Sequence, residues 1–198
     1  MKILLAEDQS MVRGALAALL GMEDGFEITQ AEDGDRAWLL MKQNSYDILL
    51  TDIEMPGRSG LELAQWVLQQ KFPTKTIIIT TFGRAGYIRR AIDMGVAGFL
   101  LKDAPSEQLI ESIYKVMDGK RVIDGELAMM ALGEADPLND KERRALRLAA
   151  EGKTTAEIAT VLCLSEGTVR NYLSEAIAKL HAANRVDAAR IARQKGWI

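Results

Sequence analysis

Short apolar runs alternate with longer amphipathic stretches through the first 118 residues of the chain. The short runs predict strands, and the stretches with apolar residues at helical spacing predict helices. We expect strands at residues 3–6, 26–31, 47–51, 76–80 and 98–101, and helices at 11–20, 34–43, 59–69, 87–94 and 106–117. Near-continuous apolar strands between helices indicate an α/β doubly wound domain with a five-stranded parallel sheet, whose site lies at the carboxyl ends of the strands.

The pattern changes after residue 118. Residues 119–136 contain Gly119, Gly125 and Gly133 and interrupt the alternation, so they predict a linker, with a short helix at 126–132 as an option within it. From residue 137 onward the apolar spacing is helical, and we expect helices at 140–151, 155–162, 166–180 and 185–195. The predicted organisation is a doubly wound domain at 1–118, a linker at 119–136 and an all-helical domain at 137–198.

The two predicted domains differ in the sign of their charge. Residues 137–198 carry 11 basic and 7 acidic side chains, whereas residues 1–136 carry 14 basic and 21 acidic ones. Such a contrast indicates two domains with different partners, and nucleic acid is the candidate partner of the basic domain.

The rare residue types exclude several classes of protein. The single cysteine, Cys163, lies in an apolar run, so we predict a buried small side chain rather than a reactive thiol. One cysteine and one histidine, His181, cannot assemble a Cys/His zinc site. The N-terminal apolar run is too short for a signal peptide and no segment reaches the length of a membrane span, so we expect a cytoplasmic protein without a membrane partner.

Three carboxylates follow strands that the topology brings together. Glu7 and Asp8 come directly after the first predicted strand, and Asp52 comes directly after the third. The first and third strands are neighbours in a doubly wound sheet, so their carboxyl ends converge. Clustered carboxylates repel one another unless a cation neutralises them, and oxygen ligands of this kind suit Mg²⁺. The alternative, acidic residues in ordinary polar loops, explains one such residue better than three at converging strand ends.

Two further strand ends carry groups that complement this acidic pocket. Thr80 ends the fourth predicted strand and Lys102 follows the fifth, and a hydroxyl and an ammonium group there can each bind a phosphoryl oxygen. With these residues in place, residues 1 to about 118 resemble the CheY-like receiver domains of bacterial response regulators. The matching residues, in order, are Glu7-Asp8, Asp52, Met55-Pro56-Gly57, Gly60, Thr80, and Lys102 with Asp103-Ala104-Pro105.

The resemblance implies the chemistry of phosphorylation. It makes Asp52 the nucleophile that takes a phosphoryl group from a sensor histidine kinase, while Lys102 pairs with that group and Thr80 swings to bond it. Phe99 stands where the family has its switch aromatic, although a phenylalanine on a buried strand is usually a core residue.

The resemblance also implies Mg²⁺ as the cofactor. Asp8 and Asp52 would hold the ion, with Glu7 acting through water. The backbone carbonyl of Glu54 would provide a further ligand.

The basic domain contains a helix, a short turn and a second helix, which Ser165 is placed to cap. One face of the second helix is apolar and predicted to be buried, with Val169, Leu173, Ala176, Ile177 and Leu180. The opposite face is small and polar, with Gly167, Asn171, Ser174 and Ala178, and Arg170 on its flank. Such a face fits a DNA groove, where arginine can read guanine and asparagine can read adenine. Periodicity alone fits a plain solvated helix equally well.

A second resemblance favours DNA binding. The segment is similar to the LuxR-type helix-turn-helix of the NarL/FixJ family of response regulators, with departures at Asn139, Arg144, Tyr172 and His181. The matching residues are Leu138, Glu142, Leu146, Gly152, Glu157-Ile158-Ala159, Leu162, Ser165 to Val169, Lys179-Leu180 and Asn184-Arg185. The DNA contacts carried over onto this sequence are Ser165, Thr168, Arg170, Asn171, Ser174 and Lys179.

Together the resemblances imply a two-component response regulator rather than an enzyme. Phosphorylation of Asp52 by a histidine kinase would promote homodimerisation and binding to a double-stranded DNA operator, with RNA polymerase as a further candidate partner. A phosphate-ester hydrolase is one alternative, but Glu54 stands where haloacid-type phosphatases have a second Asp. A regulator that binds DNA regardless of phosphorylation is another alternative, and it stays open.

Two receiver faces are candidates for pairing in a dimer. The first joins the helices at 11–20 and 106–117, where Met11, Leu16, Ile110 and Ile113 exceed what one buried face needs, although all four could be core residues. The second lies around Arg89, Arg90 and the strand at Phe99.

Overall fold

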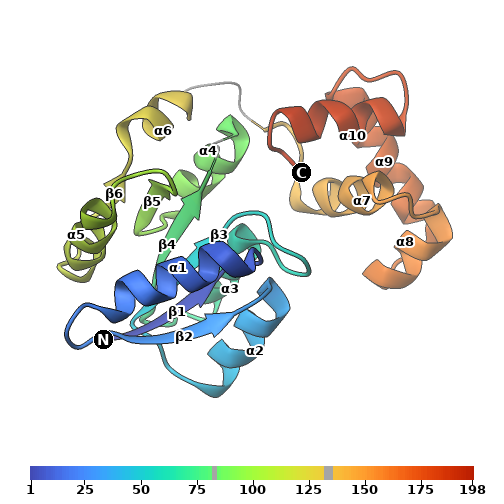
Figure 1. Cartoon of the computed structure of the whole chain (residues 1–198). Coiled ribbons are helices and arrows are strands. Elements are labelled where there is room, and N and C mark those ends of the chain that lie inside the picture. Colours follow the sequence, from blue (N-terminus) through green and yellow to red (C-terminus); the bar gives the residue numbers. More distant parts are fainter. Residues whose placement is uncertain (82–83, 132–135) are drawn as a thin grey trace. The chain divides into compact units, whose positions relative to one another are not determined.

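The computed structural model describes residues 1–81, 84–131 and 136–198, with the side chain of residue 130 left out. The chain divides into two compact units. One comprises Met1–Gly83 and Tyr87–Leu132, and we call it the receiver unit. The other comprises Arg84–Gly86 and Gly133–Ile198, and we call it the helical unit. Figure 1 shows the elements of both units in chain order.

The receiver unit is built around a parallel sheet with the strand order β2-β1-β3-β4-β5-β6. Its strands are β1 (Lys2–Ala6), β2 (Glu27–Ala31), β3 (Ile48–Asp52), β4 (Lys75–Thr80), β5 (Gly98–Leu101) and β6 (Val122–Ile123). Its helices are α1 (Ser10–Gly21), α2 (Gly34–Gln43), α3 (Gly60–Gln69), α4 (Ala85–Met94), α5 (Ser106–Met117) and α6 (Gly125–Met130). The doubly wound class is confirmed, and β1 and β3 are neighbours as expected.

Alternate residues of the strands point to opposite faces of the sheet, and each face has its own helices. Ile3 and Leu5 of β1 belong to a core cluster with α1 and α5, whereas Leu4 belongs to a cluster with α2 and α3. Phe99 of β5 faces a third cluster, which includes residues of α3, α4 and α6. Because both faces are covered, the central strands β1, β3 and β4 each contain a run of apolar residues, which made them recognisable in the sequence.

The sheet has six strands where the sequence predicted five. Val122 and Ile123 form β6, which pairs in parallel with Gly98 and Phe99 of β5. A two-residue strand is too short to show any periodicity, so the segment read as part of a linker. The short helix expected at 126–132 is present as α6 at Gly125–Met130, and Leu132 lies outside the described residues.

The helical unit contains α7 (Asp140–Ala150), α8 (Thr155–Leu162), α9 (Glu166–Lys179) and α10 (Arg185–Gln194), so its all-helical class is confirmed. A polar side chain at the start of each helix accepts hydrogen bonds from backbone N–H groups of the first turn, which would otherwise lack partners. The capping residues are Asn139, Thr154, Ser165 and Asn184. The apolar face of α9 lies in the core of this unit.

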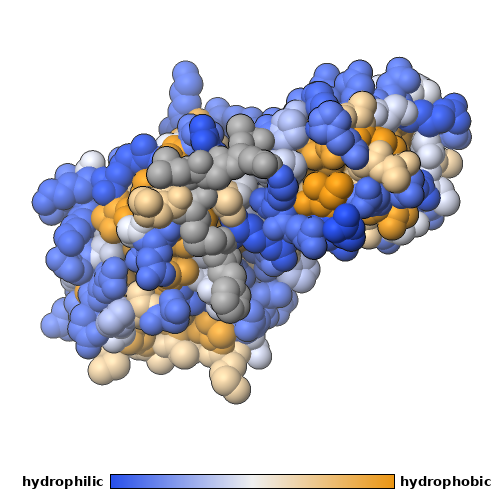
Figure 2. Space-filling model, turned by 90° about the horizontal axis from the view of Figure 1, so that it is seen from above, coloured by the Kyte–Doolittle hydropathy of each residue, from blue (hydrophilic) through white to orange (hydrophobic). Residues whose placement is uncertain are grey.

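Cys163 corrects one sequence-based prediction. The residue is exposed, and it ends α8 in the left-handed region with φ 55° and ψ 45°. The apolar run that suggested burial is therefore broken by a sharp turn between α8 and α9. Within the described residues, no helix is long and apolar enough to cross a membrane. In the face shown by Figure 2, hydrophilic residues cover most of both units.

Candidate functional site

The ends of β1 and β3 bring three carboxylates together. Ala6 of β1 is aligned with Thr51 of β3, so Glu7, Asp8 and Asp52 follow at the same edge of the sheet. Carboxylate oxygens of the three residues lie within 4.8 Å of one another. Glu7 is fully buried, Asp52 is 7% exposed and Asp8 is exposed. The convergence predicted from the sequence is thus present.

Lys102 enters this pocket from the end of β5. Its Nζ lies 2.6 Å from Oε2 of Glu7 and 3.1 Å from Oδ2 of Asp52. The backbone N–H of Lys102 donates to the carbonyl of Thr80 at 2.8 Å, which places the ends of β4 and β5 side by side. The pocket therefore has two buried carboxylates and one buried ammonium group, and Asp8 adds a further negative charge at its rim.

Burial of Asp52 is visible in its acidity. Burial, opposed by the charge of Lys102 and reinforced by that of Glu7, raises the pKa of Asp52 to about 6. Nζ of Lys102 and Oε2 of Glu7 are held in an ion pair, so the buried carboxylates of Glu7 and Asp52 share a single ammonium group.

The loop after Asp52 is held closely to the end of β3. The backbone N–H of Ile53 donates to Oδ1 of Asp52 at 2.7 Å, and Gly60 donates to the carbonyl of Ile53 at 2.9 Å. A Cβ atom on Gly60 would lie 2.0 Å from the carbonyl oxygen of Asp52, so this position requires glycine. The nucleophile predicted from the sequence is therefore fixed in place by its own loop.

Two residues of the site's surroundings were missed in the sequence. Nη1 of Arg13 on α1 donates to the carbonyl of Glu7 at 2.7 Å and so anchors the loop after β1. The hydroxyl of Tyr87 on α4 donates to Oε1 of Glu54 at 3.2 Å. Both contacts depend on the tertiary packing of a helix against a strand end, and no sequence spacing signals them. Phe99, the expected switch aromatic, is fully buried.

In the helical unit, α9 exposes the polar face that the sequence predicted. Oγ of Ser165 accepts the N–H of Thr168 at 3.1 Å and lies 2.9 Å from its hydroxyl. Arg170, Asn171 and Ser174 are exposed on the helix that follows. Arg170 is 3.7 Å from Glu166, an exposed pair that holds its side chain only weakly.

Lys179 has an internal partner that the sequence did not reveal. Its Nζ donates to Oε1 and Oε2 of Glu142 at 2.7 and 2.8 Å. Glu142 is fully buried, and it also accepts hydrogen bonds from the backbone and side chain of Asn139. The expected DNA contact of Lys179 stays a prediction, while its side chain links α9 to α7.

Comparison with protein families agrees with both units. Residues 3–114 match the model of the response regulator receiver domain, and residues 136–192 match that of the bacterial regulatory proteins of the luxR family. The chain is 46% identical to the transcriptional regulatory protein DesR of Bacillus subtilis over 197 residues, covering 99% of this chain and 98% of DesR. It is also 46% identical to the uncharacterised transcriptional regulatory protein YvfU of the same species, covering 100% of this chain and 99% of YvfU.

Solved structures give the same result. The response regulator ChrA of a heme-sensing two-component system matches with a TM-score of 0.58 at 29% identity, covering 100% of this chain and 98% of ChrA. RcsB of Salmonella enterica serovar Typhimurium matches with a TM-score of 0.72, covering 96% of this chain and 97% of RcsB, and at 22% identity it shows the fold alone. The chain therefore belongs to the response regulators that join a receiver domain to a LuxR-type DNA-binding domain.

Proposed function

We propose that a sensor histidine kinase phosphorylates Asp52 and that phosphorylation increases the affinity of α9 for an operator sequence, so that transcription responds to the kinase. The observation that carries this proposal is the buried carboxylate of Asp52 beside Lys102 in a pocket with excess negative charge. In the transfer, an oxygen of Asp52 bonds to phosphorus as the bond from phosphorus to the kinase's histidine nitrogen breaks. Lys102 and Thr80 then bind oxygens of the new phosphoryl group.

The pocket fits a magnesium ion. Glu7, Asp8 and Asp52 offer the all-oxygen donor set that Mg²⁺ prefers, and a divalent cation would neutralise their excess charge. Asp8 and Asp52 would bind it directly and Glu7 through water, with the backbone carbonyl of Glu54 as a further ligand. When bound, Mg²⁺ neutralises charge that develops on the transferring phosphoryl oxygens.

We assign the DNA interface to the start and exposed face of α9. The capped first turn places backbone N–H groups where a phosphate can bind, and Ser165 and Thr168 lie beside them. Arg170 and Asn171 can read base edges in the major groove, and Ser174 lies one turn further on. Lys179, at the end of α9, is proposed to contact the DNA backbone while it keeps its ion pair with Glu142.

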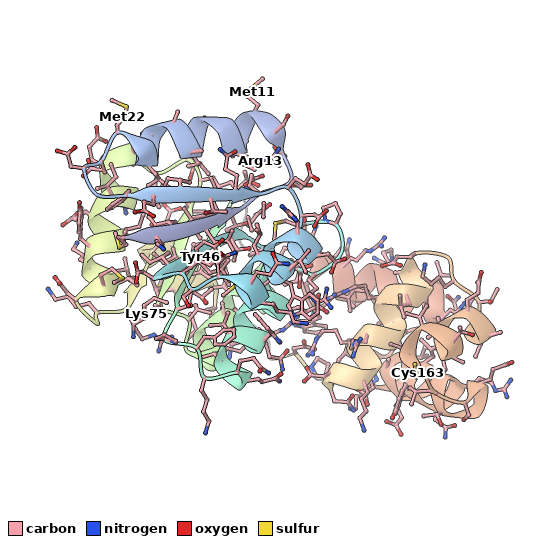
Figure 3. The ribbon with its side chains drawn as sticks, turned by 90° about the horizontal axis from the view of Figure 1, so that it is seen from below. Met11, Arg13, Met22, Tyr46, Lys75 and Cys163 are labelled. Carbon is pink, nitrogen blue, oxygen red and sulfur yellow. The ribbon has the colours of Figure 1, made fainter. Side chains whose placement is uncertain are left out.

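Dimerisation would bring two copies of α9 to two half-sites, because one short helix contacts too few base pairs for useful specificity. We favour the receiver face of α1 and α5 for pairing. Met11 of α1 and Met22, which directly follows that helix, are 86% and 84% exposed and project away from the sheet (Figure 3). Tyr114 and Met117 of α5 are also exposed apolar side chains. Ile113, which the sequence offered for this patch, is buried core instead.

The other candidate face is less suited to pairing. Phe99 is fully buried, and β6 occupies the edge of β5.

Leu16 and Ile110, which were also expected in the α1 and α5 patch, are partly buried against the core beneath that patch. Structures of RcsB include a promoter complex with a phosphomimetic and dimers bound to DNA, and we propose a similar assembly for this chain.

The protein is proposed to act in the cytoplasm, where kinase domain, DNA and RNA polymerase are all accessible. The test is selection of genomic DNA fragments by the protein with and without a small phosphodonor and Mg²⁺, followed by affinity measurements on the selected site. Phosphorylation should tighten binding at least about fivefold. Equal affinities in both states would instead favour a regulator that ignores phosphorylation.

A second arm of the same experiment tests the interface. Arg170→Ala should weaken specific binding by about 1–3 kcal/mol and relax the preference at one base pair if the arginine reads guanine. The control is Arg185→Ala, which changes a basic side chain at the start of α10. Equal weakening on all DNA sequences by Arg170→Ala would assign the residue to the phosphate backbone.

A further inference from the structure

Tyr87 of α4 connects the phosphorylation site to a helix near the end of the receiver unit. The side chain is only 7% exposed, and its hydroxyl donates to Oε1 of Glu54 at 3.2 Å. Glu54 lies two residues after Asp52, in the loop that would provide a backbone ligand for Mg²⁺. A hydrogen bond to a carboxylate is stronger than one between neutral groups. We therefore expect the loop that contains Glu54 to move together with α4.

The ring of Tyr87 belongs to a buried apolar cluster that reaches α6. The cluster includes Ile53, from the loop after Asp52, and Phe99 of β5. It also includes Leu127, which is 1% exposed, and Ala131 at the end of α6. The loop after Asp52 and α6 therefore pack into the same cluster. Because the cluster is close-packed, a movement of one of its side chains displaces the others.

α6 is fixed to this cluster rather than left as a loose connection. The backbone N–H of Asp124 donates to the carbonyl of Phe99 at 3.0 Å, directly before α6 begins. The guanidinium of Arg121 donates to the carbonyls of Ile92 and Val96 at 3.0 and 3.3 Å, which ties the chain before β6 to the end of α4. A shift of α4 or β5 must consequently be accompanied by a shift of α6 or by the loss of these bonds.

We infer that Tyr87 is a positioning residue that couples the loop after Asp52 to α6, and through α6 to the segment leading into the DNA-binding unit. The inference rests on the proposed function, since it concerns how phosphorylation is transmitted. When phosphorylation of Asp52 moves the loop that follows it, the hydroxyl of Tyr87 moves with Glu54. The ring of Tyr87 then displaces its neighbours in the cluster. A tyrosine that served stability alone would affect both phosphorylation states equally.

The test compares Tyr87→Phe with Tyr46→Phe in the full-length protein. Tyr46, labelled in Figure 3, is equally buried but belongs to a different core cluster, which contains residues of α2 and α3 and none of α6. Each variant is phosphorylated with a small phosphodonor and Mg²⁺, and DNA affinity is measured with and without phosphorylation. Tyr87→Phe should accept the label to the same extent as wild type, while the ratio of its two DNA affinities falls at least about fivefold. Tyr46→Phe should keep the wild-type ratio.

A second measurement follows the route itself. Hydrogen exchange in α6 should change when beryllofluoride is added to wild type, and this response should be lost in Tyr87→Phe but kept in Tyr46→Phe. Leu127→Ala is a further variant that leaves the phosphorylation site unchanged. It should reduce the ratio of the DNA affinities with and without phosphorylation by a similar factor. The double variant should lose no more than the stronger single variant, because both changes interrupt one route.

The outcomes separate this inference from the proposed function. A wild-type ratio of one would mean that phosphorylation does not control DNA binding, and the proposed function would fail first. A wild-type response that persists in Tyr87→Phe, with unchanged exchange in α6, would overturn the inference and leave the proposed function intact. Full additivity of Tyr87→Phe and Leu127→Ala would also overturn it.

Discussion

Each unit of this protein pairs a lysine with a buried carboxylate, but the side chain of Lys102 in the receiver unit is buried and that of Lys179 in the helical unit is exposed. The receiver cluster contains Glu7, Asp52 and Lys102, so two buried carboxylates share one ammonium group. The helical cluster contains Glu142 and Lys179, with hydrogen bonds from Asn139 to the carboxylate and a further interaction between Glu142 and the exposed Glu175. In the first cluster two buried carboxylates share one lysine, whereas in the second the one buried carboxylate has a lysine and further hydrogen-bond donors of its own.

The acidities of the carboxyl groups reflect this difference. In the receiver cluster, burial raises the pKa of Asp52 to about 6 despite the attraction of Lys102. In the helical cluster, burial also acts to raise the pKa of Glu142, but hydrogen bonds from Lys179 and Asn139 outweigh it and lower that pKa. Ion pairing therefore stabilises the carboxylate of Glu142 on folding, whereas folding destabilises the carboxylate of Asp52.

The comparison separates a structural pair from a functional one. A buried carboxylate whose hydrogen bonds are complete has nothing left to bind, so the helical cluster is expected to hold α7 and α9 together. A cluster with surplus charge reduces stability until a ligand neutralises it, which is the usual trade between stability and function at a site. Four predictions test this distinction.

The largest expected effect is on phosphorylation. Asp52→Asn should abolish incorporation of a base-labile phosphoryl group from a small phosphodonor in the presence of Mg²⁺, because the amide cannot act as the nucleophile. Asp47→Asn is the matched control, since Asp47 precedes the same strand at its other end and accepts the backbone N–H of Lys2. Intact mass spectrometry measures the added group. A phosphorylated Asp52→Asn protein would assign the nucleophile elsewhere.

The second prediction concerns the stability that the helical cluster gains from its lysine. Lys179→Met leaves the buried carboxylate of Glu142 without its ammonium partner and should lower the free energy of unfolding by about 3 kcal/mol. Lys153→Met removes a lysine of similar exposure whose partner Glu151, 3.5 Å away, is itself exposed, and it should change the free energy of unfolding by less than about 1 kcal/mol. Urea unfolding followed by circular dichroism compares the two. Equal effects would mean that the helical cluster contributes no more than a surface pair.

These clusters also show what could be predicted from the sequence. Asp52 and Lys102 follow apolar strands whose order is set by the doubly wound topology, so their meeting at one edge could be predicted from spacing alone. Glu142 and Lys179 lie on different helices, and no periodicity indicates that these two particular residues touch. Lys179 consequently looked like a free basic residue on a DNA-binding helix.

The other differences have similar physical causes. The strand β6 has two residues and no detectable period, and it exists because the edge of β5 offers it backbone partners. Cys163 sits in an apolar run, but the chain turns there with a positive φ, which the residue types around it did not reveal. The hydrogen bond from Tyr87 to Glu54 spans two elements that only the folded sheet brings together.

Magnesium should distinguish the two clusters directly. At ten times its dissociation constant, Mg²⁺ should raise the unfolding free energy of the receiver unit by about 1.4 kcal/mol, because it binds the folded acidic pocket and not the unfolded chain. Asp8→Asn should remove most of this effect while leaving the buried residues of the pocket in place. Hydrogen exchange with and without Mg²⁺ resolves the two units. Protection of the helical unit should not change, since Glu142 is already neutralised, and an equal increase in both units would contradict the comparison.

The smallest effect is the pH dependence that the receiver cluster predicts. The pKa of Asp52 is about 6 in the folded protein and 3.8 in its ordinary state, so between these values the folded state binds more protons than the unfolded state. Stability should therefore rise as the pH falls. At pH 7 the charged Asp52 costs about 3 kcal/mol, so Asp52→Asn should be more stable than wild type by roughly that amount.

Lowering the pH from 7 to 5 without Mg²⁺ should reduce this difference by about 1 kcal/mol, because Asp52 becomes mostly protonated while the amide of the Asp52→Asn variant does not titrate. The measurement is urea unfolding of wild type and Asp52→Asn at both pH values, followed by tryptophan fluorescence, since Trp38 and Trp66 lie in the receiver unit. The Asp52→Asn protein also corrects for any other groups that titrate in this range. Glu142 should not contribute, because its pKa is lowered and its carboxylate stays charged above pH 5. A difference that grows as the pH falls would reverse the sign and show that folding stabilises the Asp52 carboxylate, which would remove the contrast between the two clusters.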